Sequence, residues 1–244
     1  MPLLLRVLRG HAACEFVAEF VHRLHRWLHR DGYQVTVVES ALSVRDSGYA
    51  VDVRGAALGL LEEMGILGEV REHETKMRGT TLVDETGAET GRLPAEAFAG
   101  DADRLTVSLS FATDTAALDQ RDRDGQEQAI RAAFAGNGWE APRLLDEMAQ
   151  AADFYFASAC QVELDRWSHG RIALIGDAGY CAAPTSGMGT SQALIGARVL
   201  ARELAESGGD HRAGFVAYER ELRPDVLKTQ AIGREGAKMF GAAA

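Results

Sequence analysis

Residues 170–204 read GRIALIGDAGYCAAPTSGMGTSQALIGARVLAREL, and this stretch says more about the fold than any other part of the chain. The apolar run Ile172–Ile175 predicts a buried strand that ends at Gly176-Asp177. A loop with a proline and glycines follows, and an alanine- and leucine-rich helix begins near Thr190. A strand, an acidic residue, a glycine loop and a helix start, in that order, are typical of a cofactor site.

Each part of this stretch suits a bound ligand. Glycines let the backbone approach a ligand closely. The first N–H groups of a helix, together with its dipole, favour an anion or an electron-rich oxygen. Asp177 at the strand end can accept two hydrogen bonds from a sugar diol. The alternative interpretation is a buried strand that leads to a helix through an ordinary glycine loop.

The stretch closely resembles the second FAD-binding motif, or GD motif, of the class A flavoprotein monooxygenases, which include aromatic hydroxylases and tetracycline-inactivating enzymes. The resemblance implies that Asp177, preceded by Gly176, binds a hydroxyl of the ribityl chain or the ribose linker. It also implies that a loop lies along the isoalloxazine ring of the flavin. The residues of this ring-side loop are Pro184, Gly187, Met188, Gly189 and Thr190.

The N-terminal part of the chain contains a second, weaker signal. Residues 11–30 form a predicted amphipathic helix, and Tyr33–Val38 is a predicted strand closed by Glu39. The sequence WLHRDGYQVTVVE resembles the helix, turn and strand of a flavin-type Rossmann unit, which makes Glu39 the ribose ligand. The histidines of the helix stand among arginines, which favours a solvated basic face over a metal site: His22, His25 and His29.

The sequence departs from the family at the first glycine fingerprint. The three glycine positions of G-x-G-x-x-G are occupied here by Phe16, Ala18 and Val21. Side chains at these positions block a close approach of the pyrophosphate. Leu3–Leu8 can supply a replacement strand, but the first phosphate site is absent or strongly altered.

Residues 45–93 follow the family pattern more closely. Arg45 and Arg54 are candidates for contacts with phosphate or with the ring edge, and the alternative is that both are surface arginines at a helix start. Ala56–Met64 is a predicted helix that ends at Gly65. Thr80–Leu93 is a predicted β-hairpin.

A second departure lies near residue 100, where PAEAFAG passes almost directly to DADRLTVSLSFATD. The resembled family continues here through most of a substrate-binding sheet and a middle motif shared by FAD and NAD(P)H. The chain therefore contains an apparent internal deletion. The elements expected after it are a strand at Leu105–Phe111, helices at 126–134 and 143–151, a strand within 157–167, a turn at 167–170, and a helix over His211–Phe240 interrupted at Pro224.

These elements predict an α/β protein: a Rossmann-like FAD-binding fold with a reduced β-sheet substrate region and C-terminal helices. The predicted FAD-binding domain is discontinuous and comprises residues 1–79 and 157–244. Residues 80–156 are the predicted remnant of the substrate-binding domain. The loss of half a sheet exposes strand edges, so we also expect a homodimer or low solubility.

The composition of the chain limits which binding partners and which cellular compartment we expect. The net charge of −10 argues against a nucleic-acid or anionic-membrane binder. No apolar run approaches the length of a membrane span. The 3 cysteines are scattered without a CxxC pair, which is typical of a reducing cytoplasm: Cys14, Cys160 and Cys181.

The resemblance implies an oxidoreductase in which NAD(P)H supplies electrons through FAD and O2 supplies the oxygen that hydroxylates an aromatic or similar small organic substrate. One alternative is a truncated relative that acts as a non-catalytic binding or interaction protein. A more remote alternative is an NAD(P)-binding reductase that uses Glu39 and the GD segment.

Overall fold

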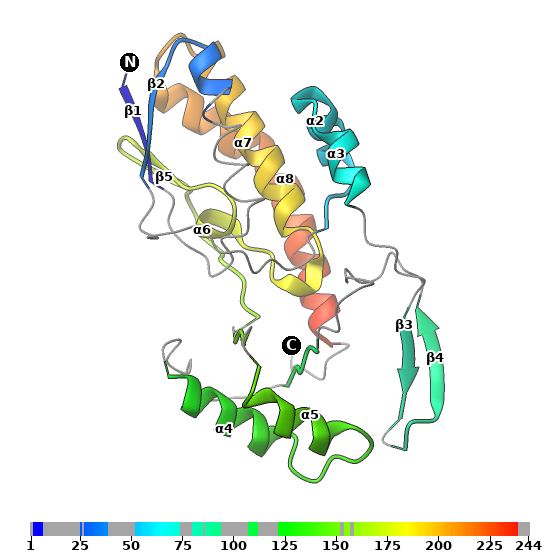
Figure 1. Ribbon diagram of the computed structural model, residues 1–244. Coiled ribbons are helices and arrows are strands. Elements are labelled where there is room, and N and C mark those ends of the chain that lie inside the picture. The colour runs from blue at the N-terminus through cyan, green and yellow to red at the C-terminus, as the bar shows by residue number, and fades with distance from the viewer. Residues whose placement is uncertain are drawn as a thin grey trace. The chain divides into compact units, whose positions relative to one another are not determined.

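A computed structural model describes most of the chain (Figure 1). The described residues are 2–6, 25, 27–38, 52–73, 80–84, 86–93, 107–111, 122–151, 154–156 and 159–238. The chain divides into two compact units, one formed by residues 1–74 and 159–236 and the other by residues 75–158 and 237–244. Their predicted roles in FAD binding and substrate binding stay predictions.

The first unit contains a parallel pair of strands. Strand β1 (Pro2–Arg6) pairs with β2 (Gln34–Val38) in parallel, with Leu4 opposite Thr36. Parallel neighbours need a crossover connection, and residues 27–30 within it are helical. The replacement strand predicted from Leu3 onward is thus present. Residue 25 of the predicted helix 11–30 is also helical, while residues 11–24 and 26, with all three substituted glycine positions, lie outside the described residues.

Helix α2 (Ala56–Met64) confirms its predicted bounds. It ends at Gly65 in a left-handed conformation with φ 77°, and the Gly65 N–H bonds to the Glu62 carbonyl at 2.9 Å. The short helix α3 (Leu67–Glu72) follows. Buried Ala57 and Leu61 of α2 pack against Leu194 of α7 (Gly189–Glu206), so α2 is held next to the helix that follows the ring-side loop.

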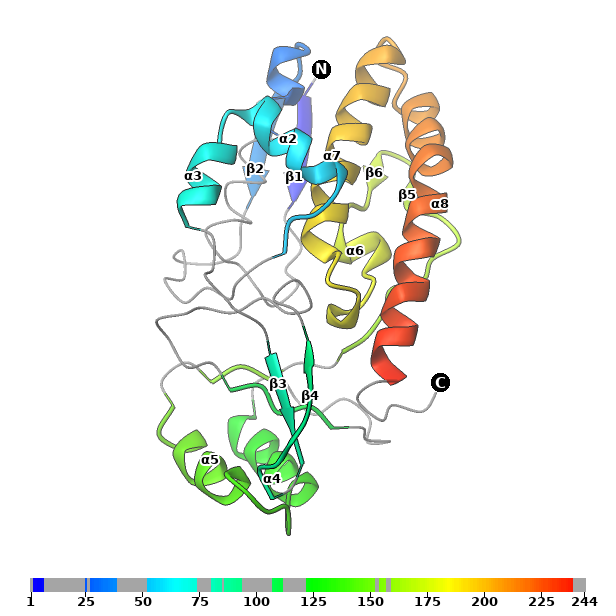
Figure 2. The same cartoon turned by 90° about the vertical axis from the view of Figure 1, so that its right-hand side faces the viewer.

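The core of the first unit lies around α7 and α8 (His211–Lys238), which run side by side in opposite directions (Figures 1 and 2). Helix α7 begins at Gly189, as the sequence predicted. The prediction that α8 is interrupted at Pro224 is wrong, because the helix continues through it. A proline has no N–H to donate to the carbonyl four residues earlier in the helix. Pro224 is exposed, so water can bind that carbonyl. The neighbouring residues Leu222 and Val226 are buried and hold the helix in place.

The GD segment differs from the buried strand that its apolar run predicted. Strand β6 comprises only Ile172–Ala173 and forms a tight hairpin with β5 (Ser168–His169), as the predicted turn at 167–170 requires. Ile172 is 65% exposed. The Leu174 N–H still donates to the Trp167 carbonyl at 2.7 Å, but the groups that could form the return bond are taken up by side chains. The Leu174 carbonyl accepts from the Tyr218 hydroxyl at 3.0 Å and the Trp167 N–H donates to the Glu219 carboxylate at 3.0 Å, so the strand stops here.

The strand predicted within 157–167 is also wrong for the described residues 159–167. They contain a single antiparallel bridge, between Gln161 and Ala182. Several of their other backbone groups bond to side chains of α8 instead of a second strand. The Trp167 N–H, for example, donates to the Glu219 carboxylate at 3.0 Å. This segment is held by a helix rather than by a sheet.

Three aromatic side chains join the GD segment to α8. The rings of Trp167 and Tyr180 lie 4.6 Å apart, and those of Trp167 and Tyr218 lie 5.7 Å apart. The hydroxyls of Tyr180 and Tyr218 are 3.1 Å apart and buried. Burial raises the pKa of Tyr180 to about 12, and burial followed by the neighbouring tyrosine raises the pKa of Tyr218 well above its ordinary value.

These raised pKa values predict a loss of stability in alkali. The pKa of tyrosine in the unfolded chain is 10.0, and the pKa of Tyr180 in the folded protein is about 12. The contribution of the protonated tyrosine to stability is therefore complete below the unfolded pKa and is lost as the pH rises through the folded pKa. In this range, the free energy of unfolding should fall by about 1.4 kcal/mol per pH unit for each tyrosine. Urea titrations below and above the unfolded pKa measure the slope. Tyr180→Phe should make it shallower, and an unchanged slope would contradict the assignment.

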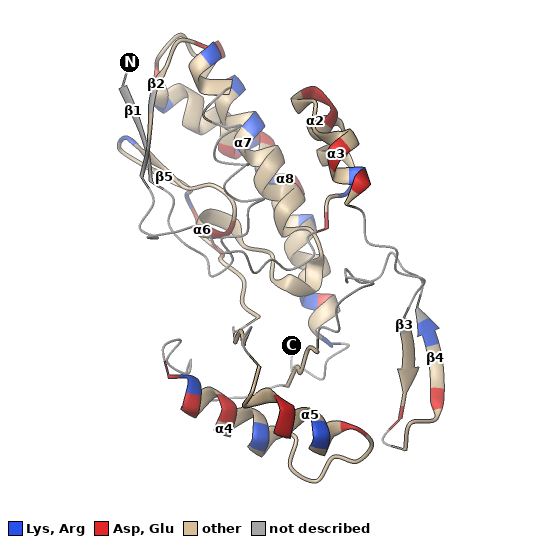
Figure 3. Cartoon of the chain, in the orientation of Figure 1, with Lys and Arg blue, Asp and Glu red and all other residues tan. Residues whose placement is uncertain are grey.

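The second unit contains a hairpin and two helices. Strands β3 (Thr80–Val83) and β4 (Glu89–Leu93) form the predicted antiparallel hairpin. Helices α4 (Arg123–Ala133) and α5 (Ala141–Met148) confirm the two helices expected here. Acidic and basic side chains are interspersed on both helices (Figure 3), and the Arg123 guanidinium bonds to the Met148 carbonyl at 3.2 Å.

The strand predicted at Leu105–Phe111 is not formed by its described residues, 107–111. A strand is stable only beside a partner that takes its backbone hydrogen bonds. The chain passes almost directly from residue 100 into this segment, where the resembled family has most of its sheet. Among the described residues, no helix combines the length and apolar character needed to span a membrane.

Candidate functional site

The candidate site lies at the N-terminal end of α7. Gly176 adopts φ 61°, and Asp177 follows it as the first residue of the one-turn helix α6 (Asp177–Tyr180). The Asp177 side chain is exposed, and a Cβ built on Gly189 would lie 3.9 Å from its Oδ1. Asp177 and the start of α7 are therefore neighbours, as the motif requires.

The ring-side loop presents backbone donors. It contains the short 3₁₀ helix η2 (Pro184–Ser186), followed by Gly187 with φ 61°. Ser186 holds it from within, because its Oγ donates to the Ala183 carbonyl at 2.8 Å and accepts from the Met188 N–H at 3.2 Å. The first helical bond of α7 runs from the Gln192 N–H to the Met188 carbonyl at 2.9 Å. The N–H groups of residues 189–191 precede that bond and can point to a ligand.

Arg54 is the predicted site residue that the tertiary structure brings to this loop. Its backbone N–H donates to the buried Ser191 Oγ at 2.8 Å, and its guanidinium bonds to Asp52 at 2.9 Å. A Cβ on Gly187 would lie 3.4 Å from Asp52 Oδ2 and 3.9 Å from Arg54 Cζ. An ion pair thus lies against the loop. Sequence reasoning missed Asp52, whose only signal is its place two residues before Arg54.

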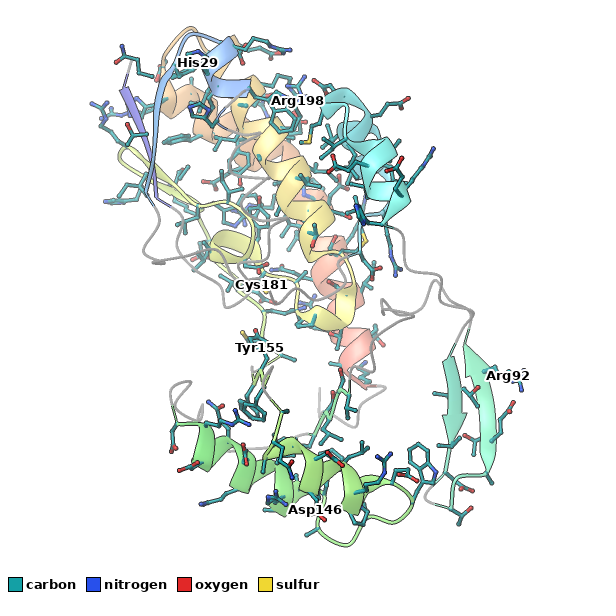
Figure 4. All side chains as sticks on the ribbon, in the orientation of Figure 1. His29, Arg92, Asp146, Tyr155, Cys181 and Arg198 are labelled. Atoms are coloured by element: carbon teal, nitrogen blue, oxygen red, sulfur yellow. The ribbon has the colours of Figure 1, made fainter. Side chains whose placement is uncertain are left out.

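Cys181 stands directly after α6 (Figure 4). Burial raises the pKa of its thiol to about 11, and the nearby Asp177 carboxylate contributes to the same shift to a smaller extent. The thiol is therefore protonated at neutral pH and is a poor nucleophile. Its Sγ lies 3.5 Å from the Cys160 carbonyl, which it can reach as a weak donor.

Gln192 in the first turn of α7 is a second residue that sequence reasoning missed. Its side chain is 5% exposed, and among the residues that the structure describes its Oε1 has no hydrogen-bond partner. A buried amide oxygen without a donor is unfavourable by about 1–3 kcal/mol. The site therefore combines free backbone donors, a carboxylate acceptor and a spare amide oxygen. This set fits a ligand such as FAD, which has both hydroxyl donors and electron-rich oxygens.

The predicted site residues separate into two groups. Most lie in one part of the first unit, at the start of α7 and beside it: Arg54, Gly176, Asp177, Pro184, Gly187, Met188, Gly189 and Thr190. Glu39 and Arg45 lie outside the described residues. Among the described side chains, no group of three or more His, Cys, Asp or Glu residues is placed to hold a metal ion.

Comparisons with known proteins show which proteins this chain resembles in sequence and in structure. No protein-family model matches the chain. The tetracycline destructase Tet(55) has a similar structure, with a TM-score of 0.78 and 26% sequence identity over 98% of this chain and 90% of its own. A flavin-dependent monooxygenase of Legionella longbeachae is 43% identical over 115 residues, which are 47% of this chain and 30% of that protein.

An uncharacterised protein of Mycobacterium tuberculosis is 28% identical over 324 residues, with 84% of this chain and 87% of that protein covered. That alignment is longer than the 244 residues of this chain, so part of the relative has no counterpart here, in agreement with an internal deletion. These findings confirm the resemblance: the fold is that of an FAD-dependent monooxygenase, and the chain is a class A FAD monooxygenase-like protein.

Proposed function

We propose that this chain binds FAD at the start of α7 and acts as an FAD-dependent monooxygenase. The observation that carries the proposal is the position of the exposed Asp177 carboxylate beside Gly189 and the free N–H groups of the first turn. In this proposal, Asp177 accepts hydrogen bonds from a flavin-sugar hydroxyl. The loop of Pro184 to Thr190 lies along the ring, and its N–H groups favour negative charge there.

The remaining contacts follow from the parallel strands. In a Rossmann-like arrangement, β1 and β2 lie side by side, and Glu39 at the end of β2 binds the adenosine ribose. Arg45 and Arg54 contact phosphate or the ring edge. Bound FAD would supply the electron and oxygen chemistry, with NAD(P)H and O2 as co-substrates and an aromatic or similar small organic molecule as substrate. The protein residues bind and orient these groups. Cytoplasmic location and a homodimer belong to the same proposal.

The second candidate function is that of a non-catalytic relative. Two observations favour it. Bulky residues, Phe16 and Val21 among them, replace the fingerprint glycines, and the flavin-dependent monooxygenase from Legionella is matched over only 30% of its length. A protein of this kind would retain the fold of the first unit without holding flavin tightly enough for turnover.

A flavin titration separates the two functions. The purified full chain should bind FAD with a dissociation constant in the micromolar range or tighter, and the visible spectrum of the bound flavin should differ from that of free FAD. NAD(P)H oxidation is then assayed with and without candidate aromatic substrates. A colourless protein whose added FAD stays free in a desalting column would favour the non-catalytic relative.

A further inference from the structure

The part of α8 beyond Pro224 holds the segment that leads into the ring-side loop. Gln161 donates through Nε2 to the Gln230 carbonyl at 2.7 Å and to the Ala182 carbonyl at 3.1 Å. Gln230 donates in return through its own Nε2 to the Val162 carbonyl at 2.8 Å. Gln230 is 3% exposed. The two amides therefore form a reciprocal lock between α8 and the bridged segments around residues 161 and 182.

The orientation of Gln161 is itself determined by α8. The Arg234 guanidinium donates to Gln161 Oε1 at 3.1 Å and to the Glu163 carboxylate at 2.8 Å. The Gln161 amide thus has its oxygen and its nitrogen both occupied. An amide whose oxygen and nitrogen are both bonded has one favourable orientation, so the lock is a specific contact rather than general packing.

Two glycines let the backbone of α8 touch the loop directly. A Cβ built on Gly233 would overlap the Ala182 carbonyl oxygen, and one on Gly236 would lie 2.6 Å from the Thr185 carbonyl oxygen. The Thr185 hydroxyl donates to the Gly233 carbonyl at 2.7 Å. Both obstacles are backbone atoms, so the loop itself would have to move if either glycine gained a side chain.

The lock acts at a strained point of the chain. Ala183 follows Ala182 immediately and has φ 65°, a conformation that is unfavourable for a residue with a side chain. Such a conformation persists only where the surroundings impose it. The Ala183 carbonyl accepts the Ser186 N–H at 3.1 Å, so the shape of η2 and Gly187 depends on this residue.

We propose that Gln230 and Gly233 are positioning residues that set the ring-side loop, through Gln161 and Ala182, for flavin binding. The part of the proposal that concerns flavin rests on the proposed function above. Neither residue touches the ligand in this proposal. They act through the loop, whose displacement would move the first-turn N–H groups of α7 away from the position where they favour a flavin oxygen.

The test uses Gln230→Met and Gly233→Ala in the full chain, with Gly59→Ala as the matched control. Gly59 is also a helical glycine, but a Cβ there meets nothing within 4 Å. Methionine keeps the length of Gln230 and removes its donors. Because alanine is the better helix former, Gly59→Ala should raise the melting temperature slightly, whereas the clash at Ala182 should prevent this gain for Gly233→Ala.

The first readout is hydrogen exchange in the protein without flavin. The amides of Ser186, Gly187 and Met188, which are bonded within the loop, should exchange about tenfold faster in both variants, while those of α2 stay unchanged. The second readout is FAD binding, which should weaken about tenfold and shift the reduction potential of the bound flavin to more negative values. The control should match the wild type in both.

If the loop amides of a folded variant exchange at the wild-type rate, the lock does not set the loop and the proposal is wrong. Faster exchange with unchanged FAD affinity and potential would overturn its role in flavin binding. If the wild-type protein binds no FAD, the proposed function fails and the flavin role of the lock falls with it, while the exchange rates still decide whether α8 sets the loop. The two failures are thereby distinguishable.

Discussion

Replacing Asp177 with alanine is expected to abolish FAD binding at micromolar flavin. In the proposed site the carboxylate accepts hydrogen bonds from a sugar diol, and hydrogen bonds to a charged group contribute about 1.5–3 kcal/mol each. Their loss should lower affinity by roughly a hundredfold or more. The measurement is a flavin-fluorescence titration of the full chain, with a desalting step to separate bound from free FAD.

The structure makes this substitution a clean test. Asp177 is exposed, so its removal should leave the fold intact. Asp177→Asn keeps one acceptor oxygen without the charge and should give an intermediate affinity. Asp146→Ala is the matched control, because Asp146 is a strongly exposed acid on α5, outside the first unit. If Asp177→Ala binds FAD as tightly as the wild type, Asp177 is not part of the site.

Replacing Gly196 with alanine should have the largest effect on stability. A Cβ there would overlap the Tyr180 hydroxyl and lie 3.2 Å from Leu222 Cδ2, both in the buried core. In an unobstructed helix, alanine would be favoured by about 1 kcal/mol. Overpacking should reverse that sign and lower the free energy of unfolding by about 3 kcal/mol. Urea denaturation followed by circular dichroism measures the change.

A double substitution identifies the clash. Tyr180→Phe removes the hydroxyl, and the next nearest atom of the ring lies 3.2 Å from the position of the added methyl group, so much of the overlap disappears. Alone it should cost about 1 kcal/mol, because the Tyr218 hydroxyl loses one partner and keeps the Leu174 carbonyl. Gly196→Ala with Tyr180→Phe should then be more stable than the two single effects predict, by about 1–2 kcal/mol. Strict additivity would place the strain elsewhere.

The Gly196 contact also bears on the candidate site. Tyr180 ends the helical turn that Asp177 begins, and its hydroxyl lies against α7 at Gly196. The same hydroxyl pairs with Tyr218 of α8. Asp177 is therefore positioned by contacts with both long helices. Helix α8, which lies outside the GD motif, supports both sides of the site: Asp177 through Tyr218 and Tyr180, and the ring-side loop through Gln230.

Sequence patterns were reliable where the signal was local. The left-handed glycine at Gly65 ended α2 at the predicted residue, and α7 began at Gly189, beside the predicted Thr190. The hairpin β3–β4 likewise depends on a short turn. Its Asp84 carboxylate accepts the Thr86 N–H at 2.8 Å, and bonds from Thr86 and Ala88 lower the pKa of Asp84.

The strands β1 to β4 formed where they were predicted, but the strand predictions at 105–111, 157–167 and 172–175 failed for the described residues, because a strand depends on partners that a local pattern does not include. The run Ile172–Ile175 is apolar enough for a buried strand, yet only two of its residues lie in β6, and the Leu174 carbonyl accepts from the Tyr218 side chain instead of from a strand partner. The described part of Leu105–Phe111 has the composition of a strand but no ladder. Pro224 is the converse case, because α8 is held by packing on both sides of the proline and continues through it.

By itself, the sequence determined the family resemblance, the order of the GD motif and the helices that begin and end at capping residues, since these depend on residues a few positions apart. Only the tertiary structure decided that Arg54 and Asp52 lie against Gly187, that the Gln192 amide oxygen has no partner within the described part of the chain, and that Gln230 bonds to the segment before the loop. These contacts join residues far apart in the chain. Their partners are chosen by the packing of α2, α7 and α8, which has no periodic signature in the sequence.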